Sequence, residues 1–177
     1  MDESDKVDTG TQYVDDQDMS TQTTNNNPEA ILTYDMEVQL GILSNRLLHG
    51  SYWFLILDLM FTTKLQLMGL ARSARKREAA CMESAMTIMS WVMEKGGRVK
   101  MADIAKPDYG REEDFTAEYA VRTMATLDTW LEQGVREVVE MVVGKEVQGM
   151  EEMLKRVLEK HRDLHWESQA MKNTVFQ

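Results

Sequence analysis

Two histidines one helical turn apart have the spacing of a metal-binding pair. His161 and His165 are four positions apart in a stretch of helical pattern. Such a pair can present two imidazoles to one ion such as Zn²⁺. The next turn offers only Ser168 and Gln169, which are poor completions of a metal site. A core or surface role for both histidines is therefore favoured, and metal binding is the alternative.

A stripe of methionines is a second set of side chains with potential chemistry. Thioethers can bind a soft ion such as Cu(I) or grip a haem, but methionine is also a pliable filler of protein cores. Packing is the favoured role of the stripe, which consists of Met82, Met86, Met89 and Met93.

Charged residues form two further groups. A basic group predicts a solvated face or salt bridges between subunits, with an anion site as the alternative; it consists of Arg72, Arg75, Lys76 and Arg77. Glu151 and Glu152 open the last helical segment, where carboxylates stabilise the positive end of the helix dipole.

The composition excludes several classes of function. The 177 residues carry a formal net charge of −10, which disfavours nucleic acids and anionic membranes as partners. Cys81 is the only cysteine, so an intrachain disulfide or a cysteine-rich metal site cannot form. The N-terminus lacks a signal-peptide pattern. The longest apolar run, Tyr52 to Phe61, contains Asp58 and is too short to span a bilayer. We therefore expect a cytoplasmic protein without membrane contact.

The chain divides into an acidic tail and one helical domain. Residues 1–33 have too few apolar groups to offset the entropy of ordering, so a disordered, solubilising tail is expected, with a docking segment as the alternative. Residues 34–172 carry apolar stripes spaced by three and four, which predict helices at about 36–61, 67–94, 114–143 and 147–171. Asp114 is the expected N-cap of the third helix.

The apolar stripes indicate how these helices pack. The first helix has one seam that includes Leu40, Leu47 and Phe54, and further apolar residues outside it: Trp53, Leu55, Ile56, Leu59 and Met60. A helix that is apolar on more than one side needs a second partner, which predicts a subunit interface. The third helix has its seam at Tyr119, Met124, Leu127, Leu131, Val135, Val138 and Val142.

The link between the second and third helices is much longer than the others. Gly96 and Gly97 favour a helix stop, because glycine readily adopts positive φ. Pro107 disfavours renewed helix before it. Four long helices with one long crossover predict an all-α four-helix bundle.

This crossover resembles that of the ferritins. The pattern with which that family leaves its second helix is present at Gly96 to Val99, Ile104 and Lys106 to Asp108. Weaker similarities occur at Gly50 to Leu55, Leu67 to Arg72, Ile88 to Met89 and Glu118 to Val121. The resemblance implies a ferritin-like bundle with up-down-down-up topology. The short fifth helix of the family is expected to be missing, which puts a complete closed cage in question.

The resemblance also implies where an iron-oxidising centre would lie. Active subunits hold two irons with glutamates and a Glu-x-x-His pair, because iron favours carboxylate oxygens and an i,i+3 pair presents two ligands from one face. The corresponding positions here are Leu47, Ala80, Cys81, Ser84 and Met124, and an inward tyrosine becomes Phe54. Carboxylates buried there without metal would be costly. We therefore expect a filled core, no ferroxidase activity and no metal at the bundle centre.

Positions that nucleate mineral in the family are also depleted of acids. They fall on Lys76, Ala79, Ala80, Glu83 and Met86, of which only Glu83 is a carboxylate. Glu151 and Glu152 lie near the place where ferritins have the acids of their threefold iron channel, which is the alternative to their role at the helix end. The candidate metal ligands are thus Glu83, Glu151, Glu152, His161 and His165.

The resemblance implies a catalytically inactive ferritin-like subunit. It would contribute to iron storage and iron homeostasis as a structural component of the shell, with iron present only as stored mineral. Its expected partners are itself or other ferritin subunits, through a dimer formed by the first two helices and a mixed shell of about 24 subunits. The alternative is a helical-bundle interaction protein that has lost iron binding.

Overall fold

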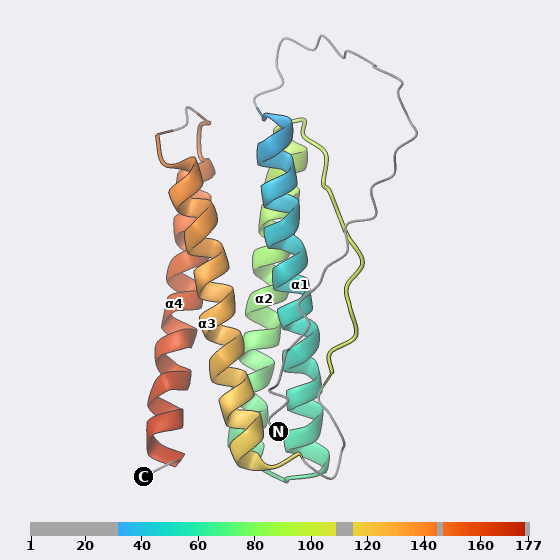
Figure 1. Ribbon diagram of the computed structural model, residues 1–177, viewed down its shortest axis with the longest axis vertical. Helices are drawn as coiled ribbons and strands as arrows, with labels where there is room; N and C mark the ends of the chain where they lie inside the picture. The colour runs from blue at the N-terminus through green and yellow to red at the C-terminus, as the bar shows by residue number, and fades with distance from the viewer. Residues whose placement is uncertain (1–31, 109–114, 145–146, 176–177) are drawn as a thin grey trace, which may run out of the picture.

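The fold is a bundle of four long α-helices (Figure 1). The computed structural model describes residues 32–108, 115–144 and 147–175. The helices are α1 (Tyr34–Thr63), α2 (Met68–Glu94), α3 (Ala117–Val142) and α4 (Met150–Val175). No strand occurs among the described residues, so the predicted all-α class is confirmed. Over the same residues, none of the helices combines the length and the apolar character needed to cross a membrane.

The helices form two antiparallel hairpins. α1 packs against α2, α3 packs against α4, and the hairpins meet through α1 with α3 and through α2 with α4. After α2 the chain returns alongside α1 to the other end of the bundle, so α3 runs parallel to α2 (Figure 1). The predicted up-down-down-up topology with one long crossover is therefore confirmed.

The glycine pair ends α2 as expected. Gly96 adopts φ +74°. Its N–H donates to the carbonyl of Met93 at 3.0 Å, and the N–H of Gly97 donates to the carbonyl of Val92 at 2.9 Å. These two bonds form a Schellman motif, which satisfies carbonyls that a helix end otherwise leaves unpaired.

The starts of α3 and α4 differ from the predictions. The N-cap of α3 is Thr116, whose hydroxyl accepts from the N–H of Tyr119 at 3.1 Å. The expected cap, Asp114, lies outside the described residues and is not the cap of this helix. α4 begins at Met150, so Val147 precedes it and packs in the core instead. The cap of α3 lies two residues later than predicted, because several adjacent polar residues can cap a helix. The start of α4 lies three residues later than predicted and directly follows Gly149, which adopts φ +84°.

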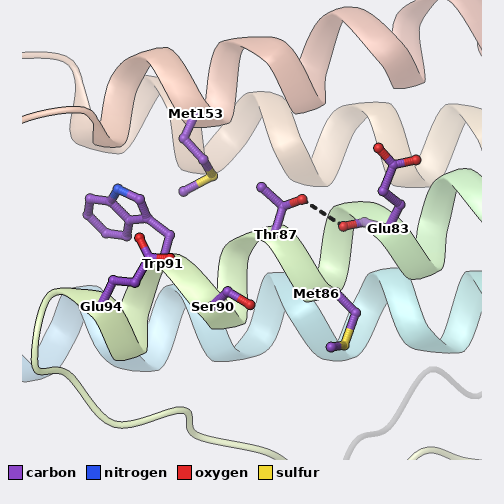
Figure 2. A pocket seen from close by; sticks show the side chains of 7 residues that line it. All are labelled: Glu83, Met86, Thr87, Ser90, Trp91, Glu94 and Met153. Carbon is purple, nitrogen blue, oxygen red and sulfur yellow. Dashed lines mark hydrogen bonds between the residues drawn. The ribbon is translucent and has the colours of Figure 1, made fainter.

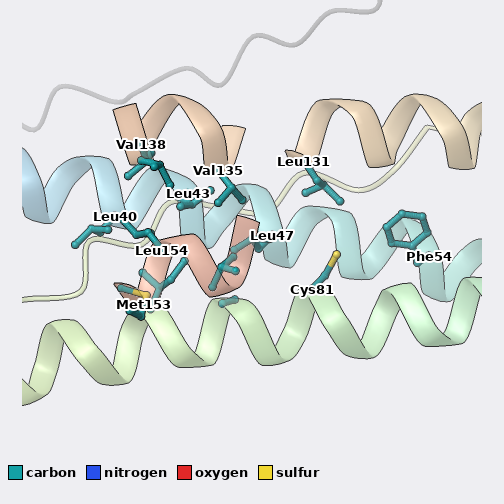
Figure 3. Packing of buried hydrophobic residues seen from close by; sticks show 14 of the residues in the cluster. Leu40, Leu43, Leu47, Phe54, Cys81, Leu131, Val135, Val138, Met153 and Leu154 are labelled. Atoms are coloured by element: carbon teal, nitrogen blue, oxygen red, sulfur yellow. The ribbon is translucent and has the colours of Figure 1, made fainter. Parts of the chain in front are cut away.

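The core fills the axis of the bundle. The predicted α1 seam is buried, as are most predicted inward residues of α2 and α4 (Figure 3). In α3 the seam begins at Ala120 and Val121, whereas Tyr119 is 38% exposed, so its predicted inward position was wrong. Leu32 is also buried, so the packed chain begins just before α1. The rest of the expected tail lies outside the described residues.

The crossover is fastened to the first turns of α1. The N–H of Arg98 donates to Glu37 Oε1 at 2.8 Å. Further along, the backbone of Lys100 lies so close to Gly41 that a Cβ added there would stand 2.2 Å from the Lys100 carbonyl oxygen. Only a residue without a side chain allows this approach.

Replacing Gly41 by alanine should therefore loosen the crossover. We expect Gly41→Ala to lower the free energy of unfolding by about 1 to 3 kcal/mol, because a backbone atom must move to admit the methyl group. Denaturant unfolding followed by circular dichroism measures this. Gly69→Ala is the matched control, since Gly69 is also helical and a Cβ there meets nothing within 4 Å. Equal stability of the two variants would contradict the close approach.

Candidate functional site at the bundle centre

The positions that the resemblance assigned to iron ligands lie together in the core. Leu47, Cys81 and Met124 are fully buried, Ser84 is 2% exposed and Ala80 is 5% exposed. Leu47, Cys81 and the buried ring of Phe54 lie between the helices in Figure 3. Burial raises the pKa of the Cys81 thiol, which keeps it protonated and makes it a poor metal ligand or nucleophile.

A buried ion pair joins three helices beside this apolar centre. Arg77 of α2 is 0% exposed, and its Nε donates to Asp128 Oδ2 of α3 at 2.7 Å. Its Nη2 donates to the carbonyl of Leu164 in α4 at 2.8 Å, and its Nη1 donates to the hydroxyl of Ser73 at 2.5 Å. Arg77 therefore clamps the first hairpin to both helices of the second; we call this set of contacts the Arg77 clamp.

The two charges of the clamp are strongly desolvated. Asp128 is 1% exposed, and its Oδ1 has no hydrogen-bond partner among the described residues. Burial raises the pKa of Asp128 to about 6, and the Arg77 guanidinium acts against that rise. The ionised form of Asp128 thus depends on the neighbouring Arg77, since desolvation alone disfavours a charged carboxylate.

Sequence reasoning placed Arg77 on the wrong face. The basic group was expected to be solvated or to pair between subunits, but Arg77 is buried. Arg75 pairs with Asp58 at 3.0 Å and Lys76 pairs with Glu167 at 2.5 Å, all within the chain. A signal was present: Arg77 lies at the i+3 position after Ala74 and four before Cys81, so it falls on the α2 seam. Asp128 likewise fits the α3 seam between Met124 and Leu131 better than Leu127 does.

The two histidines of the candidate metal pair have different neighbours. His161 is 1% exposed, and its Nε2 lies 3.2 Å from the hydroxyl of Ser84 in α2. His165 is half-buried, and its Nδ1 lies 3.2 Å from the hydroxyl of Thr129 in α3. Burial lowers the pKa of His161 to about 4, and the charge of Lys160 adds to this. His161 is thus a neutral core residue at neutral pH.

The candidate carboxylates are engaged in separate ion pairs. Glu83 pairs with Lys160 at 2.6 Å. Glu151 and Glu152 pair with the bases one turn later in α4, at 2.5 Å to Lys155 and 3.9 Å to Arg156. Within the described ranges, no three His, Cys, Asp or Glu side chains gather closely enough to hold a metal. Metal binding by Glu83, Glu151, Glu152, His161 and His165 therefore stays a prediction, and the structure does not bring these side chains together in one site.

The methionine stripe lies largely on the surface, so its predicted packing role within the chain was wrong. Met82, Met86 and Met93 are 40%, 52% and 68% exposed, and only Met89 is packed against the core. Part of the stripe lines a shallow groove of about 390 Å³ between α2 and the start of α4 (Figure 2). The lining consists of Glu83, Met86, Thr87, Ser90, Trp91, Glu94 and Met153.

Comparison with known proteins supports the fold. No protein-family model and no curated protein matches the sequence. Among solved structures, the chain is similar to an open-pore ferritin from the hyperthermophilic archaeon Archaeoglobus fulgidus, with a TM-score of 0.72 and 18% identity. The match covers 82% of this chain and 87% of that one. The architecture is therefore a ferritin-like four-helix bundle.

Breaking the Arg77 clamp from one side should be strongly destabilising. We expect Arg77→Met to lower the free energy of unfolding by about 3 to 5 kcal/mol, because Asp128 is left as a buried, unpaired charge. The double variant Arg77→Met/Asp128→Leu should regain most of the loss. Lys155→Met, which removes an exposed pair, should cost less than about 1 kcal/mol. A loss for Arg77→Met as small as that of Lys155→Met would contradict the clamp.

His161 should make stability depend on pH. Because its folded pKa of about 4 lies below the ordinary 6.5, the unfolded chain binds more protons in this range and stability falls as pH falls. His161→Gln keeps a partner for Ser84 but does not titrate. The stability of the wild type relative to His161→Gln should drop by about 3 kcal/mol between pH 7 and pH 4. Asp128, whose folded pKa is raised, makes stability rise as pH falls, but it does so equally in both proteins and cancels in the comparison. A stability difference between the wild type and His161→Gln that does not change with pH would contradict the lowered pKa of His161.

Proposed function

We propose that this chain is a catalytically inactive ferritin-like subunit that contributes to iron storage as a structural component of a shell. The observation that carries the proposal is the replacement of the iron-ligand positions by buried, mostly apolar side chains in a ferritin-like bundle. Leu47, Cys81 and Met124 are fully buried at these positions, and none of them carries a carboxylate. Because ferrous and ferric ions need hard oxygen ligands, such a core supports packing rather than iron oxidation.

The Arg77 clamp adds an electrostatic argument. Arg77 precedes Cys81 by one helical turn, and both charges of its ion pair act on that thiol, the charge of Asp128 more strongly than that of Arg77. The Asp128 carboxylate is already bound to the Arg77 guanidinium at 2.7 Å. The most deeply buried carboxylate beside the apolar centre is therefore paired with a cation of the chain itself, which leaves it less available to a metal.

The outer face of α1 supports assembly. Tyr52, Leu55 and Leu59 are 38%, 42% and 52% exposed, and they lie outside the seam that faces the core. Large apolar side chains that gather on one helix face commonly mark a protein contact. A second chain packed on this face would bury them, which fits a subunit that works within an assembly and mixes with active subunits.

The second candidate function is that of an interaction protein that kept the bundle and lost iron. It is favoured by the depletion of acids at positions that nucleate mineral in ferritins, where Lys76, Ala79, Ala80 and Met86 stand beside Glu83. The two candidates differ in whether the chain joins a shell.

Co-expression with an active ferritin subunit tests the proposal. We expect the chain to co-elute with that subunit in a particle of shell size, and the chain purified alone to oxidise Fe(II) no faster than buffer does. Size-exclusion chromatography with light scattering and the absorbance of ferric products measure the two outcomes. The active subunit alone is the positive control for oxidation.

Variants of α1 test whether its exposed apolar face is the surface through which the chain assembles. Leu55→Lys/Leu59→Lys should abolish co-elution, because two charges enter an apolar contact. Leu67→Lys, at a 37% exposed apolar residue in the turn after α1, is the matched control and should assemble normally. If the chain stays a monomer and does not co-elute with the active subunit, the shell role is refuted and the second candidate function, an interaction protein, is favoured. Rapid Fe(II) oxidation by the chain alone would refute its inactivity.

A further inference from the structure

The methionine stripe of α2 presents thioether sulfurs to solvent. Its members Met82, Met86, Met89 and Met93 follow one another by four, three and four residues, so they lie within about 60° of one another around the helix. Met82, Met86 and Met93 are 40%, 52% and 68% exposed, and Met89 is partly buried. In Figure 2 the Met86 side chain lies on the side of the groove opposite Met153. The sulfur of Met86 is therefore not packed against α4.

Neighbouring members of the stripe are close enough to share one ion. Side chains three or four positions apart on a helix have Cβ atoms about 5 to 6 Å apart. Methionine is unbranched and has three rotatable bonds, so the sulfurs of Met82 and Met89 can turn toward a common point beside Met86. Leucine at these positions would offer the same apolar surface without a metal ligand.

The charges around the stripe suit a cation. Residues 78–94 of α2 contain no lysine, arginine or histidine, and they carry the carboxylates Glu78, Glu83 and Glu94. The nearest bases have partners: Arg75 pairs with Asp58, Lys160 of α4 pairs with one of the glutamates, and Lys95 lies against a tryptophan ring. No base therefore stands on α2 between the thioethers. The net charge of −10 also raises the concentration of cations near the chain.

We propose that the methionine stripe binds Cu(I), with Met86 as the central ligand and Met82 and Met89 about one turn to either side. Thioether sulfur is a soft ligand that favours Cu(I) over hard ions such as Mg²⁺, which prefer oxygen. A thioether carries no proton, so this site differs from histidine and cysteine sites in needing no deprotonation. The site lies on the surface, away from the apolar centre of the bundle. It does not depend on iron or on assembly into a shell.

Methionine-methyl NMR of the full chain tests the site. The probe is Ag(I), which has the charge and the ligand preference of Cu(I) and does not oxidise in air, titrated in chloride-free buffer. We expect saturable shifts at the three ligand methionines. Mg²⁺ should leave these methyl groups unshifted. The control methionines, which are exposed elsewhere on the molecule and should not shift comparably, are Met68, Met101 and Met141. Shifts spread over all exposed methionines, or none in the stripe, would overturn the proposal.

Variants of the stripe test the named ligands against Cu(I) itself. The affinity is measured without oxygen by competition with a coloured Cu(I) chelator. Met82→Leu/Met86→Leu removes two sulfurs at nearly constant volume, so the fold is kept, and it should weaken Cu(I) binding by about tenfold or more. Met101→Leu/Met141→Leu is the matched control and should stay within about twofold of the wild type. Equal affinities of the two double variants would contradict the assignment.

Two further measurements separate thioether ligands from thiol and imidazole ligands. Cys81→Ala should leave the Cu(I) affinity within about twofold, since the Cys81 thiol is fully buried and protonated. The Ag(I)-induced shifts should persist at about pH 5.5, where an ordinary histidine is mostly protonated and binds metal poorly. A tenfold loss of affinity in Cys81→Ala, or loss of the shifts at the lower pH, would assign the ion to other ligands and overturn the proposal.

Discussion

The structure depends on one buried guanidinium. Arg77 lies at the point where α2, α3 and α4 meet, and its donors reach a carboxylate, a backbone carbonyl and a hydroxyl on these helices. Apolar side chains could fill this space without fixing how one hairpin is placed along the other, because they pack in more than one way. A buried charge tolerates far fewer arrangements, since any shift that separates Arg77 from Asp128 leaves two desolvated ions unpaired. The clamp therefore explains how the two hairpins keep one register although the centre between them is apolar.

The Arg77 clamp and the apolar centre both limit the cost of buried negative charge in the bundle. Carboxylates inside a helical bundle need cations to offset their desolvation. In a bundle that binds iron, the metal supplies that charge; here Arg77 supplies it to Asp128, the most deeply buried carboxylate of the described residues. The buried Asp58 and Glu132 pair with the more exposed Arg75 and Arg136. His161 and Ser84 continue the polar strip as a neutral pair, because burial keeps the imidazole uncharged. The interior thus pairs its deepest carboxylate within the chain and leaves only Asn45 Oδ1 and Asp128 Oδ1 without a hydrogen-bond partner among the buried side-chain atoms of the described residues.

Much of the fold could be predicted from the sequence, because the helical period, the Gly96 and Gly97 stop and the long link are local or nearly local signals. The resemblance to ferritins led to the expectation of a filled core at Leu47, Cys81 and Met124, and these three side chains are indeed fully buried. The clamp was missed because Arg77 was grouped with its basic neighbours instead of being placed on the α2 seam. The exposure of Met82 and Met86 could not be predicted, since methionine suits both cores and surfaces and only the packing of α4 against α2 decides between them.

Iron-soaked crystals give the most direct test of the central claim, that packed side chains and the Arg77 clamp occupy the place of a metal centre. Diffraction data collected at the iron absorption edge locate bound iron without any assumption about the mechanism. The account predicts no anomalous peak among Leu47, Cys81, Ser84 and Met124, with Arg77 still bound to Asp128. A pair of iron peaks between the helices, with the Arg77 side chain displaced from Asp128, would contradict it.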